Sequence, residues 1–194
     1  MGPRPRPPIR LPLRFVRHGA TEANLAGLRC GGDLDLPLTI VGRWQAVEAA
    51  RRIVRLEPKI GLIVTSDLQR TRETAALIAA ALPGTPMAIE PDLAERFLGE
   101  WNMRPVDETQ PWLLAGCTPP GGESDLEFLE RISRGLRRIK DCLGQRPLLV
   151  GSKGVARALG ELTGQPRSTD IGNGEVTEFE LASLPFLETT WGAP

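Results

Sequence analysis

The sequence predicts an α/β fold: a three-layer α/β/α sandwich with a mostly parallel central sheet. Short apolar runs alternate with longer stretches of helical periodicity, a pattern typical of parallel sheets covered by helices on both faces. The chain has 194 residues, 41% hydrophobic and 25% charged, so it can bury one sizeable core. No repeat or linker divides it. We therefore expect one domain over residues 11–194, preceded by a disordered Pro/Arg-rich tail over residues 1–10.

The first strand and helix of the expected fold come from the N-terminal quarter of the chain. Residues 13–17 are predicted as a strand that ends at His18, and residues 25–37, rich in Gly, Asp and Pro, as a loop. A helix is expected from Thr39 until Pro58 closes it. Its apolar stripe is predicted to consist of Ile40, Trp44, Val47 and Val54.

A second strand–helix unit follows. Residues 62–65 are predicted as a buried strand, and Ser66 with Gln69 as a capping box for a helix that runs to about Ala81. The core stripe of this helix is expected at Leu77, Ile78 and Ala81. After Pro83-Gly84, residues 87–89 form a weak predicted strand.

The remainder of the chain alternates in the same way after a long interruption. Residues 91–122 carry several prolines and glycines and two tryptophans, and are predicted as a long irregular excursion. A helix is then expected from Ser124, with Glu127 three residues on, to about Leu143. The last predicted elements are a strand at 148–150, a short helix through Val155, Leu159 and Leu162, and a strand at 176–181.

Charge and cysteine content exclude several classes of protein. Lys plus Arg and Asp plus Glu are 24 each, without the basic excess of a nucleic-acid binder. No apolar run reaches the roughly 18–20 residues of a membrane span, and the N-terminus has no apolar core typical of a secretory signal. Three widely spaced cysteines form no C-x-x-C pair, so we expect no zinc ribbon, no disulfide framework and a cytoplasmic location.

Three segments are expected to meet at one edge of the sheet, because ligands of such sheets bind at the carboxyl ends of the strands. They are Arg17-His18-Gly19, residues 66–70 and residues 151–154. His18 is the only histidine in the chain. A neutral imidazole can attack phosphorus, and a guanidinium beside it can bind phosphate oxygens as a planar fork.

Arg70 lies in the first turn of a predicted helix, where backbone N–H groups and positive potential favour an anion. The same residues have structural alternatives when each is taken alone. A single histidine can be a packed core or surface residue, Arg70 a solvated arginine on a helix, and Glu95 a solvated loop carboxylate.

Motifs for other phosphate chemistries fit the sequence poorly. Asp33-Leu34-Asp35 has the D-x-D spacing of aspartate-nucleophile phosphatases, but it does not follow an apolar strand. None of the three cysteines has the arginine six residues later that a cysteine phosphatase needs. Residues 151–154 (G-S-K-G) lack the full P-loop spacing.

The run from Val16 to Asn24, V-R-H-G-A-T-E-A-N, resembles the signature of the histidine phosphatase superfamily, which includes the cofactor-dependent phosphoglycerate mutases. The resemblance covers about residues 13–181 and continues through residues 35–39, Gly42, residues 65–75, residues 93–101 and residues 120–124. It implies a phosphoglycerate mutase-like fold that needs neither metal nor cofactor. The loop before Thr39 and the Pro-Gly-Gly-Glu segment are most similar to small phosphatases of the α-ribazole phosphatase type.

The resemblance also implies roles for single residues. His18 would form the phosphohistidine intermediate, Arg17 and Arg70 would hold the phosphoryl oxygens, and Asn24 would line the phosphate pocket. Glu95 would protonate the leaving alcohol and then activate water, as hydrolysis of a phosphomonoester requires.

One position departs from the family pattern. The family has a second histidine after the late strand, and aligning Gly154-Val155 with the family pattern puts Ser152 there. Ser152 can give one hydrogen bond and Lys153 a charge, and both are predicted to form a modified corner of the phosphate site. The alternative is that Ser152 only caps the next helix and Lys153 is solvated.

The sequence thus predicts a hydrolase that acts on a small phosphorylated metabolite and releases inorganic phosphate. Two alternatives remain. One is a phosphate-ligand binding or regulatory protein that kept the fold and lost turnover, for which the missing histidine is the main support. The other, ranked lower because the chain is short, is a phosphoglycerate-type mutase.

Overall fold

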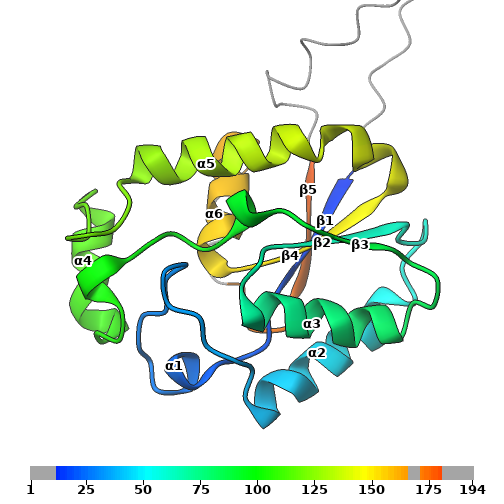
Figure 1. Cartoon of the computed structure of the whole chain (residues 1–194), viewed down its shortest axis with the longest axis horizontal. Helices are drawn as coiled ribbons and strands as arrows, with labels where there is room; N and C mark the ends of the chain where they lie inside the picture. Colours follow the sequence, from blue (N-terminus) through cyan, green and yellow to red (C-terminus); the bar gives the residue numbers. More distant parts are fainter. Residues whose placement is uncertain (1–11, 166–170, 181–194) are drawn as a thin grey trace, which may run out of the picture.

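A five-stranded sheet forms the centre of the computed structural model, which describes residues 12–165 and 171–180 (Figure 1). The strand order is β3-β2-β4-β1-β5. Four strands are parallel, and the edge strand β5 pairs with β1 in the antiparallel sense. The strands are β1 (Pro12–Arg17), β2 (Leu62–Thr65), β3 (Met87–Ile89), β4 (Pro147–Gly151) and β5 (Val176–Glu180). The predicted tail of residues 1–10 lies outside the described residues.

Helices cover both faces of this sheet, as the predicted sandwich requires (Figure 1). On one face, α5 (Asp125–Arg138) and α6 (Lys153–Leu162) pack on Phe15 of β1. On the other, α2 (Ile40–Ile53) and α3 (Gln69–Ala80) pack on Val16 of the same strand. Because successive strand side chains point to opposite faces, these two neighbours belong to different cores.

The apolar stripe predicted for α2 is wrong. Ile40 is 88% and Trp44 63% exposed, and Val54 is exposed as well. The buried face consists instead of Gly42, Ala46, Ala49, Ala50 and Ile53. The reason is a close backbone approach: a Cβ added to Gly19 would lie 2.0 Å from the carbonyl oxygen of Gly42. Only small residues fit between α2 and the segment that follows β1.

The cap predicted for α3 is also wrong, although the helix itself is confirmed. Leu68 occupies the N-cap position without a side-chain hydrogen bond, and the Ser66 hydroxyl pairs with Thr71 Oγ1 at 2.8 Å. The N–H of Gln69 donates to Asp35 Oδ1 at 2.7 Å, so a carboxylate from the distant loop stabilises this helix start. Of the predicted stripe, Ile78 is buried whereas Ala81 is exposed.

The excursion, residues 91–122, is more regular than predicted. It contains α4 (Val106–Leu114) and two short 3-10 helices, η1 (Pro91–Leu93) and η2 (Gly99–Trp101). Pro111 lies inside α4, and a proline there masks the helical pattern in the sequence. Trp101 and Trp112 pack with ring centroids 5.2 Å apart.

The remaining elements follow the prediction with shifted ends. The capping box at Ser124 and Glu127 is present. The helix it starts ends at Arg138, and a 3-10 helix, η3 (Lys140–Gln145), continues the chain. A short helix that was not predicted, α1 (Glu22–Leu25), ends at the first residue of the predicted loop over residues 25–37. No helix among residues 12–165 and 171–180 is long and apolar enough to cross a membrane; the cytoplasmic location stays a prediction.

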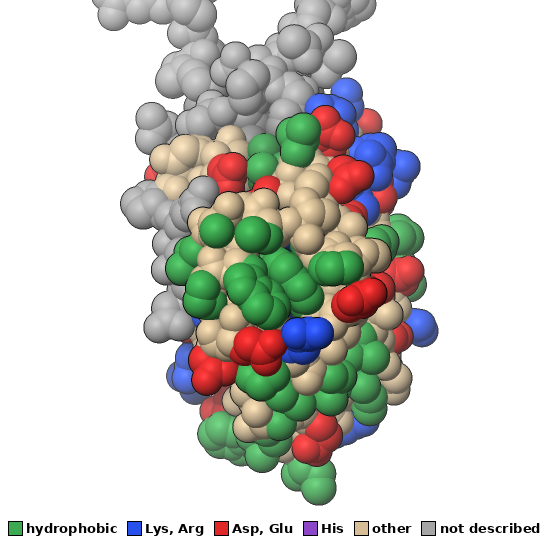
Figure 2. All heavy atoms as spheres, turned by 90° about the vertical axis from the view of Figure 1, so that its left-hand side faces the viewer, with side chains coloured by type: hydrophobic (Ala, Val, Ile, Leu, Met, Phe, Trp, Pro, Cys, Tyr) green, Lys and Arg blue, Asp and Glu red, His purple; other side chains and the backbone are tan. Residues whose placement is uncertain are grey.

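One face of the molecule is rich in apolar side chains. Figure 2 shows hydrophobic side chains gathered in an upper and a lower group, with acidic and basic side chains between them. Several large apolar side chains of the described residues are exposed: Leu25, Ile40, Val41, Trp44, Met103, Val106 and Leu114.

Candidate active site

The ends of β1 and β4 bring the first site residues together. In the parallel register of these strands, Arg17 lies opposite Gly151. The backbone N–H of His18 then donates to the carbonyl oxygen of Gly151 at 2.9 Å. His18 and Ser152 therefore follow neighbouring strands at the same edge of the sheet, as the sequence predicts.

His18 is buried and held in one orientation. Its side chain is 4% exposed, and Nδ1 lies 2.7 Å from the carbonyl oxygen of Gly19. Because a carbonyl oxygen only accepts, Nδ1 carries the proton and Nε2 keeps its lone pair. Burial, with the positive charges of Arg70 and Arg17, holds the pKa of His18 well below its usual 6.5. The imidazole is thus neutral at pH 7, the form that acts as a nucleophile.

The loop that follows α1 positions the side chain of Arg70. Its guanidinium donates from Nη1 to the carbonyl oxygen of Leu34 at 2.9 Å and from Nη2 to that of Gly31 at 3.0 Å. The residue is 1% exposed. Its Nε is buried and has no hydrogen-bond partner among the described residues. One donor of this guanidinium is therefore available to an anion.

Arg17 is tied to the segment before β5. It donates from Nη1 to the carbonyl oxygen of Ile171 at 2.7 Å. Because the charges of Arg17 and Arg70 both lower the pKa of His18, both guanidinium groups lie near the imidazole. The structure thus brings together the two arginines and the histidine that the sequence singles out.

Glu95 reaches the same region from the excursion. Its Oε2 accepts the N–H of Gly154, in the first turn of α6, at 2.9 Å, and its Oε1 accepts the N–H of Arg96 at 2.8 Å. A Cβ on Gly154 would lie 1.9 Å from Oε1, so glycine is needed for this contact. Backbone groups therefore fix the Glu95 carboxylate at the start of α6, two residues after Ser152.

Asn24 and Lys153 are predicted as phosphate ligands, and the structure shows other features for both side chains. Asn24 Oδ1 accepts the N–H of Thr21 at 3.1 Å in a capping box of α1, so its oxygen serves the helix. Lys153 is exposed at the first position of α6. Their roles as phosphate ligands stay predictions.

Three polar residues near the site are absent from the sequence interpretation. Asn173 donates from Nδ2 to the carbonyl oxygen of His18 at 2.9 Å. It sits in an irregular segment before β5, where no motif marks it. Burial lowers the pKa of Arg29, the Glu95 carboxylate opposes this change, and the charge of Arg157 adds to it. Arg29 is therefore a neighbour of both Glu95 and Arg157.

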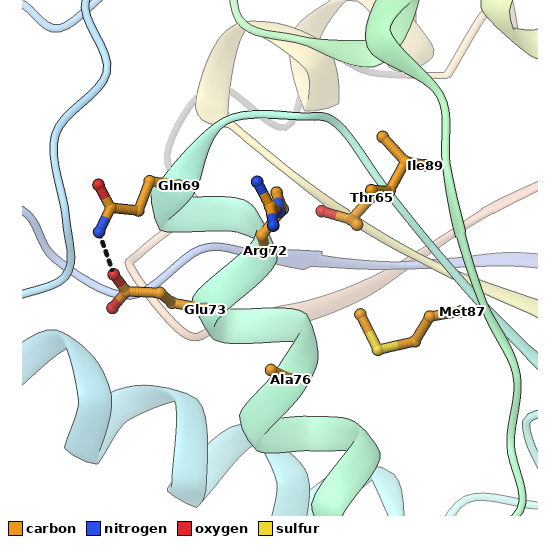
Figure 3. Close-up of a pocket in the computed structure, with 7 residues that line it drawn as sticks. All are labelled: Thr65, Gln69, Arg72, Glu73, Ala76, Met87 and Ile89. Carbon is orange, nitrogen blue, oxygen red and sulfur yellow. Dashed lines mark hydrogen bonds between the residues drawn. The ribbon is translucent and has the colours of Figure 1, made fainter.

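A separate open groove of about 580 Å³ lies between α3 and β3 (Figure 3). It is lined by Thr65, Gln69, Arg72, Glu73, Ala76, Met87 and Ile89. In the close-up, Gln69 donates from Nε2 to Glu73 Oε1 at 2.8 Å on one side of it. None of the residues predicted for the phosphate site lines this groove, so we do not place the chemistry there.

Comparison with known proteins identifies the family. The family model of the histidine phosphatase superfamily (branch 1) matches residues 13–191. A protein of Escherichia fergusonii named probable phosphoglycerate mutase GpmB is 40% identical over 201 residues, which cover 93% of this chain and 90% of that protein.

Two solved structures are similar in fold. The structure of a mycobacterial glucosyl-3-phosphoglycerate phosphatase in complex with VO3 has a TM-score of 0.72 and 30% identity, covering 87% of this chain and 90% of that one. That of a candidate alpha-ribazole-5'-P phosphatase of Escherichia coli K-12 has a TM-score of 0.69 and 25% identity, covering 88% and 95%. With a histidine at the end of β1 and two arginines near it, this chain belongs to the histidine phosphatase superfamily.

Proposed function

We propose that this protein hydrolyses a small phosphomonoester through a phosphohistidine formed on His18. The observation that carries the proposal is the state of that side chain. It is buried and neutral, its Nδ1–H donates to the carbonyl oxygen of Gly19, and the charges of Arg17 and Arg70 act on it. A neutral nucleophile close to two cations suits attack on a dianionic phosphoryl group, whose charge would otherwise repel an anionic nucleophile.

The first half-reaction forms the intermediate. The lone pair of Nε2 attacks phosphorus, the bond between phosphorus and the ester oxygen breaks, and Glu95 gives a proton to the departing alcohol. The guanidinium groups of Arg17 and Arg70 balance the charge on the phosphoryl oxygens. The hydrogen bond from Nδ1 to Gly19 stabilises the positive charge that the ring gains.

The second half-reaction returns the enzyme to its starting state. Glu95, now a carboxylate, takes a proton from a water molecule that attacks phosphorus. The bond between phosphorus and Nε2 breaks, inorganic phosphate leaves, and the ring is neutral again. The two backbone N–H groups that hold Glu95 at the start of α6 keep the carboxylate in one place for both steps.

A mutase is the second candidate, because relatives of this chain carry the name phosphoglycerate mutase. The two reactions share the phosphohistidine and differ in the acceptor of the phosphoryl group, which is water for a hydrolase and a second hydroxyl for a mutase. Incubation with a phosphoglycerate separates them. A hydrolase releases inorganic phosphate in proportion to the substrate consumed, and a mutase yields the positional isomer.

The first experiment compares wild type with His18→Ala in phosphate release from p-nitrophenyl phosphate. We expect a loss of at least about 10³-fold in kcat/KM, with the melting temperature measured alongside to confirm folding. Because His18 is the only histidine in the chain, a phosphohistidine signal in ³¹P NMR of wild type belongs to it. Turnover in the His18→Ala protein equal to that of wild type would exclude the mechanism. A wild type that binds phosphate without turnover supports the binding protein instead.

A further inference from the structure

The hydroxyl of Ser152 has no partner in the structure. Ser152 is 1% exposed and is the N-cap residue of α6, yet its side chain makes no capping hydrogen bond. Its Oγ has no hydrogen-bond partner among the described residues. A buried hydroxyl without a partner is costly, and such groups are rare in folded proteins. The helix-cap alternative considered for this residue therefore does not account for it.

Ser152 lies between the proposed nucleophile and the proposed acid. Gly151, directly before it, accepts the backbone N–H of His18 at 2.9 Å. Gly154, two residues after it, donates its N–H to Glu95 Oε2 at 2.9 Å. A residue flanked in this way by contacts to His18 and Glu95 borders the space where a phosphoryl group would sit.

The start of α6 adds positive potential at this place. The helix has ten residues, and the first N–H groups of a helix have no partner within it. Glu95 Oε2 accepts that of Gly154; together with the helix dipole, the others favour an anion. The buried Nε of Arg70 also lacks a partner among the described residues. Two buried donors without partners thus point to an anionic ligand.

We propose that the Ser152 hydroxyl and the N-terminus of α6 bind the phosphoryl oxygens as the fourth side of the site, where the family pattern places a second histidine. The hydroxyl donates to one oxygen, and the helix supplies the positive potential that an imidazolium would otherwise provide. The proposal rests on the proposed function only in taking the anion to be the substrate's phosphoryl group. The site itself binds inorganic phosphate whether or not turnover follows.

The test measures affinity for inorganic phosphate by calorimetry, and the melting temperature without phosphate, for wild type and Ser152→Ala. A hydrogen bond to a charged group is lost, so we expect affinity to fall roughly 10- to 100-fold. The melting temperature without phosphate should stay equal or rise, because the removed hydroxyl has no partner to lose. Ser133→Ala, a buried serine of α5, is the matched control and should bind phosphate as wild type does.

Two further variants sharpen the result. Lys153→Ala should weaken binding less than Ser152→Ala, because the Lys153 side chain is exposed. Ser152→His should raise turnover of simple phosphomonoesters if the wild type is a slow hydrolase. Should Ser152→Ala fail to fold, Ser152→Cys, which keeps the volume and only a weak donor, replaces it.

The outcomes separate this proposal from the proposed function. Weaker phosphate binding in Ser152→Ala by a protein without turnover supports the fourth side and rejects the hydrolase. Unchanged phosphate affinity in Ser152→Ala overturns the fourth side even if the wild type is an active hydrolase. A lower melting temperature with unchanged affinity assigns Ser152 a structural role only. Absence of phosphate binding by wild type overturns both.

Discussion

The two halves of the candidate site are held by different kinds of contact. The sheet edge carries Arg17 at the end of β1, and His18 and Ser152 directly after β1 and β4, whose register is fixed by backbone pairing. The excursion, residues 91–122, carries Glu95 and is fixed by side chains that bind backbone. Arg131 donates to the carbonyl oxygens of Asp92, Ala94 and Glu95.

A second set of contacts to the excursion comes from the loop that follows α1. Asp33 accepts the N–H of Leu98 at 2.9 Å through Oδ1 and that of Gly99 at 2.7 Å through Oδ2. Arg29 donates to Thr109 Oγ1 at 2.7 Å and to Gln110 Oε1 at 2.8 Å. The proposed phosphoryl-binding residues Arg17, His18 and Ser152 thus depend on the sheet, whereas the proposed leaving-group side depends on a few replaceable side chains.

Changing Glu95 tests this division most strongly. In Glu95→Gln the proton donor is lost, so we expect kcat/KM for an alkyl phosphate to fall about 10²- to 10⁴-fold. The loss on p-nitrophenyl phosphate should be much smaller, because p-nitrophenolate leaves without protonation. Glu100→Gln, an exposed carboxylate of η2, serves as the control. Equal losses on the two substrates would remove Glu95 from the role of general acid.

Removing Asp33 tests the contacts that hold the excursion. Asp33→Ala leaves two backbone N–H groups without their acceptor, and we expect the free energy of unfolding to fall by about 2 kcal/mol. Alkyl phosphate turnover should fall more than affinity for inorganic phosphate. The matched control is Asp141→Ala, an exposed aspartate of η3. An equal loss of phosphate affinity would mean that the two halves are not separable.

Lowering the pH tests the sheet edge, and its expected effect, on the free energy of unfolding, is the smallest of the three. The pKa of His18 is lowered in the folded protein, chiefly by burial and further by Arg70 and Arg17. Below about pH 6.5 the unfolded chain therefore binds a proton that the folded one does not. His18 then costs stability as the pH falls, by up to about 1.4 kcal/mol per pH unit, and has no such effect above that range.

The measurement is urea unfolding of wild type and His18→Gln between pH 5 and 8 in buffer without phosphate. The stability of wild type relative to His18→Gln should decrease as the pH falls below about 6.5. A difference that is independent of pH would show that the imidazole is not buried in its neutral form.

The sequence predicts the sheet edge well because local patterns determine it. An apolar strand followed by Arg17 and His18, and a second one followed by Ser152, suffice to put these residues at one edge. Contacts between residues that are far apart in the sequence cannot be predicted from such local patterns. Asp35 rather than Ser66 caps α3, and the close approach of Gly19 to Gly42 decides which face of α2 is buried.

The excursion shows the same limit for the site. Glu95 is placed by the resemblance to a family, since nothing in its local sequence brings a loop carboxylate to the start of α6. The hydrogen bond from Gly154 to Glu95 joins segments with no shared pattern. Arg29 and Arg157 are missed for the same reason, because the proximity of Arg29 to Glu95 and to Arg157 follows only from tertiary packing.

The strand order has a consequence for how the chain acquires its site. β1, which precedes His18, pairs only with β4 and β5 among the described strands, and both come from the last quarter of the sequence. During synthesis β1 therefore has no strand partner until β4 has left the ribosome. Contacts between such distant segments form slowly. A nascent or truncated chain that lacks β4 cannot pair β1 with it and therefore cannot assemble the proposed site.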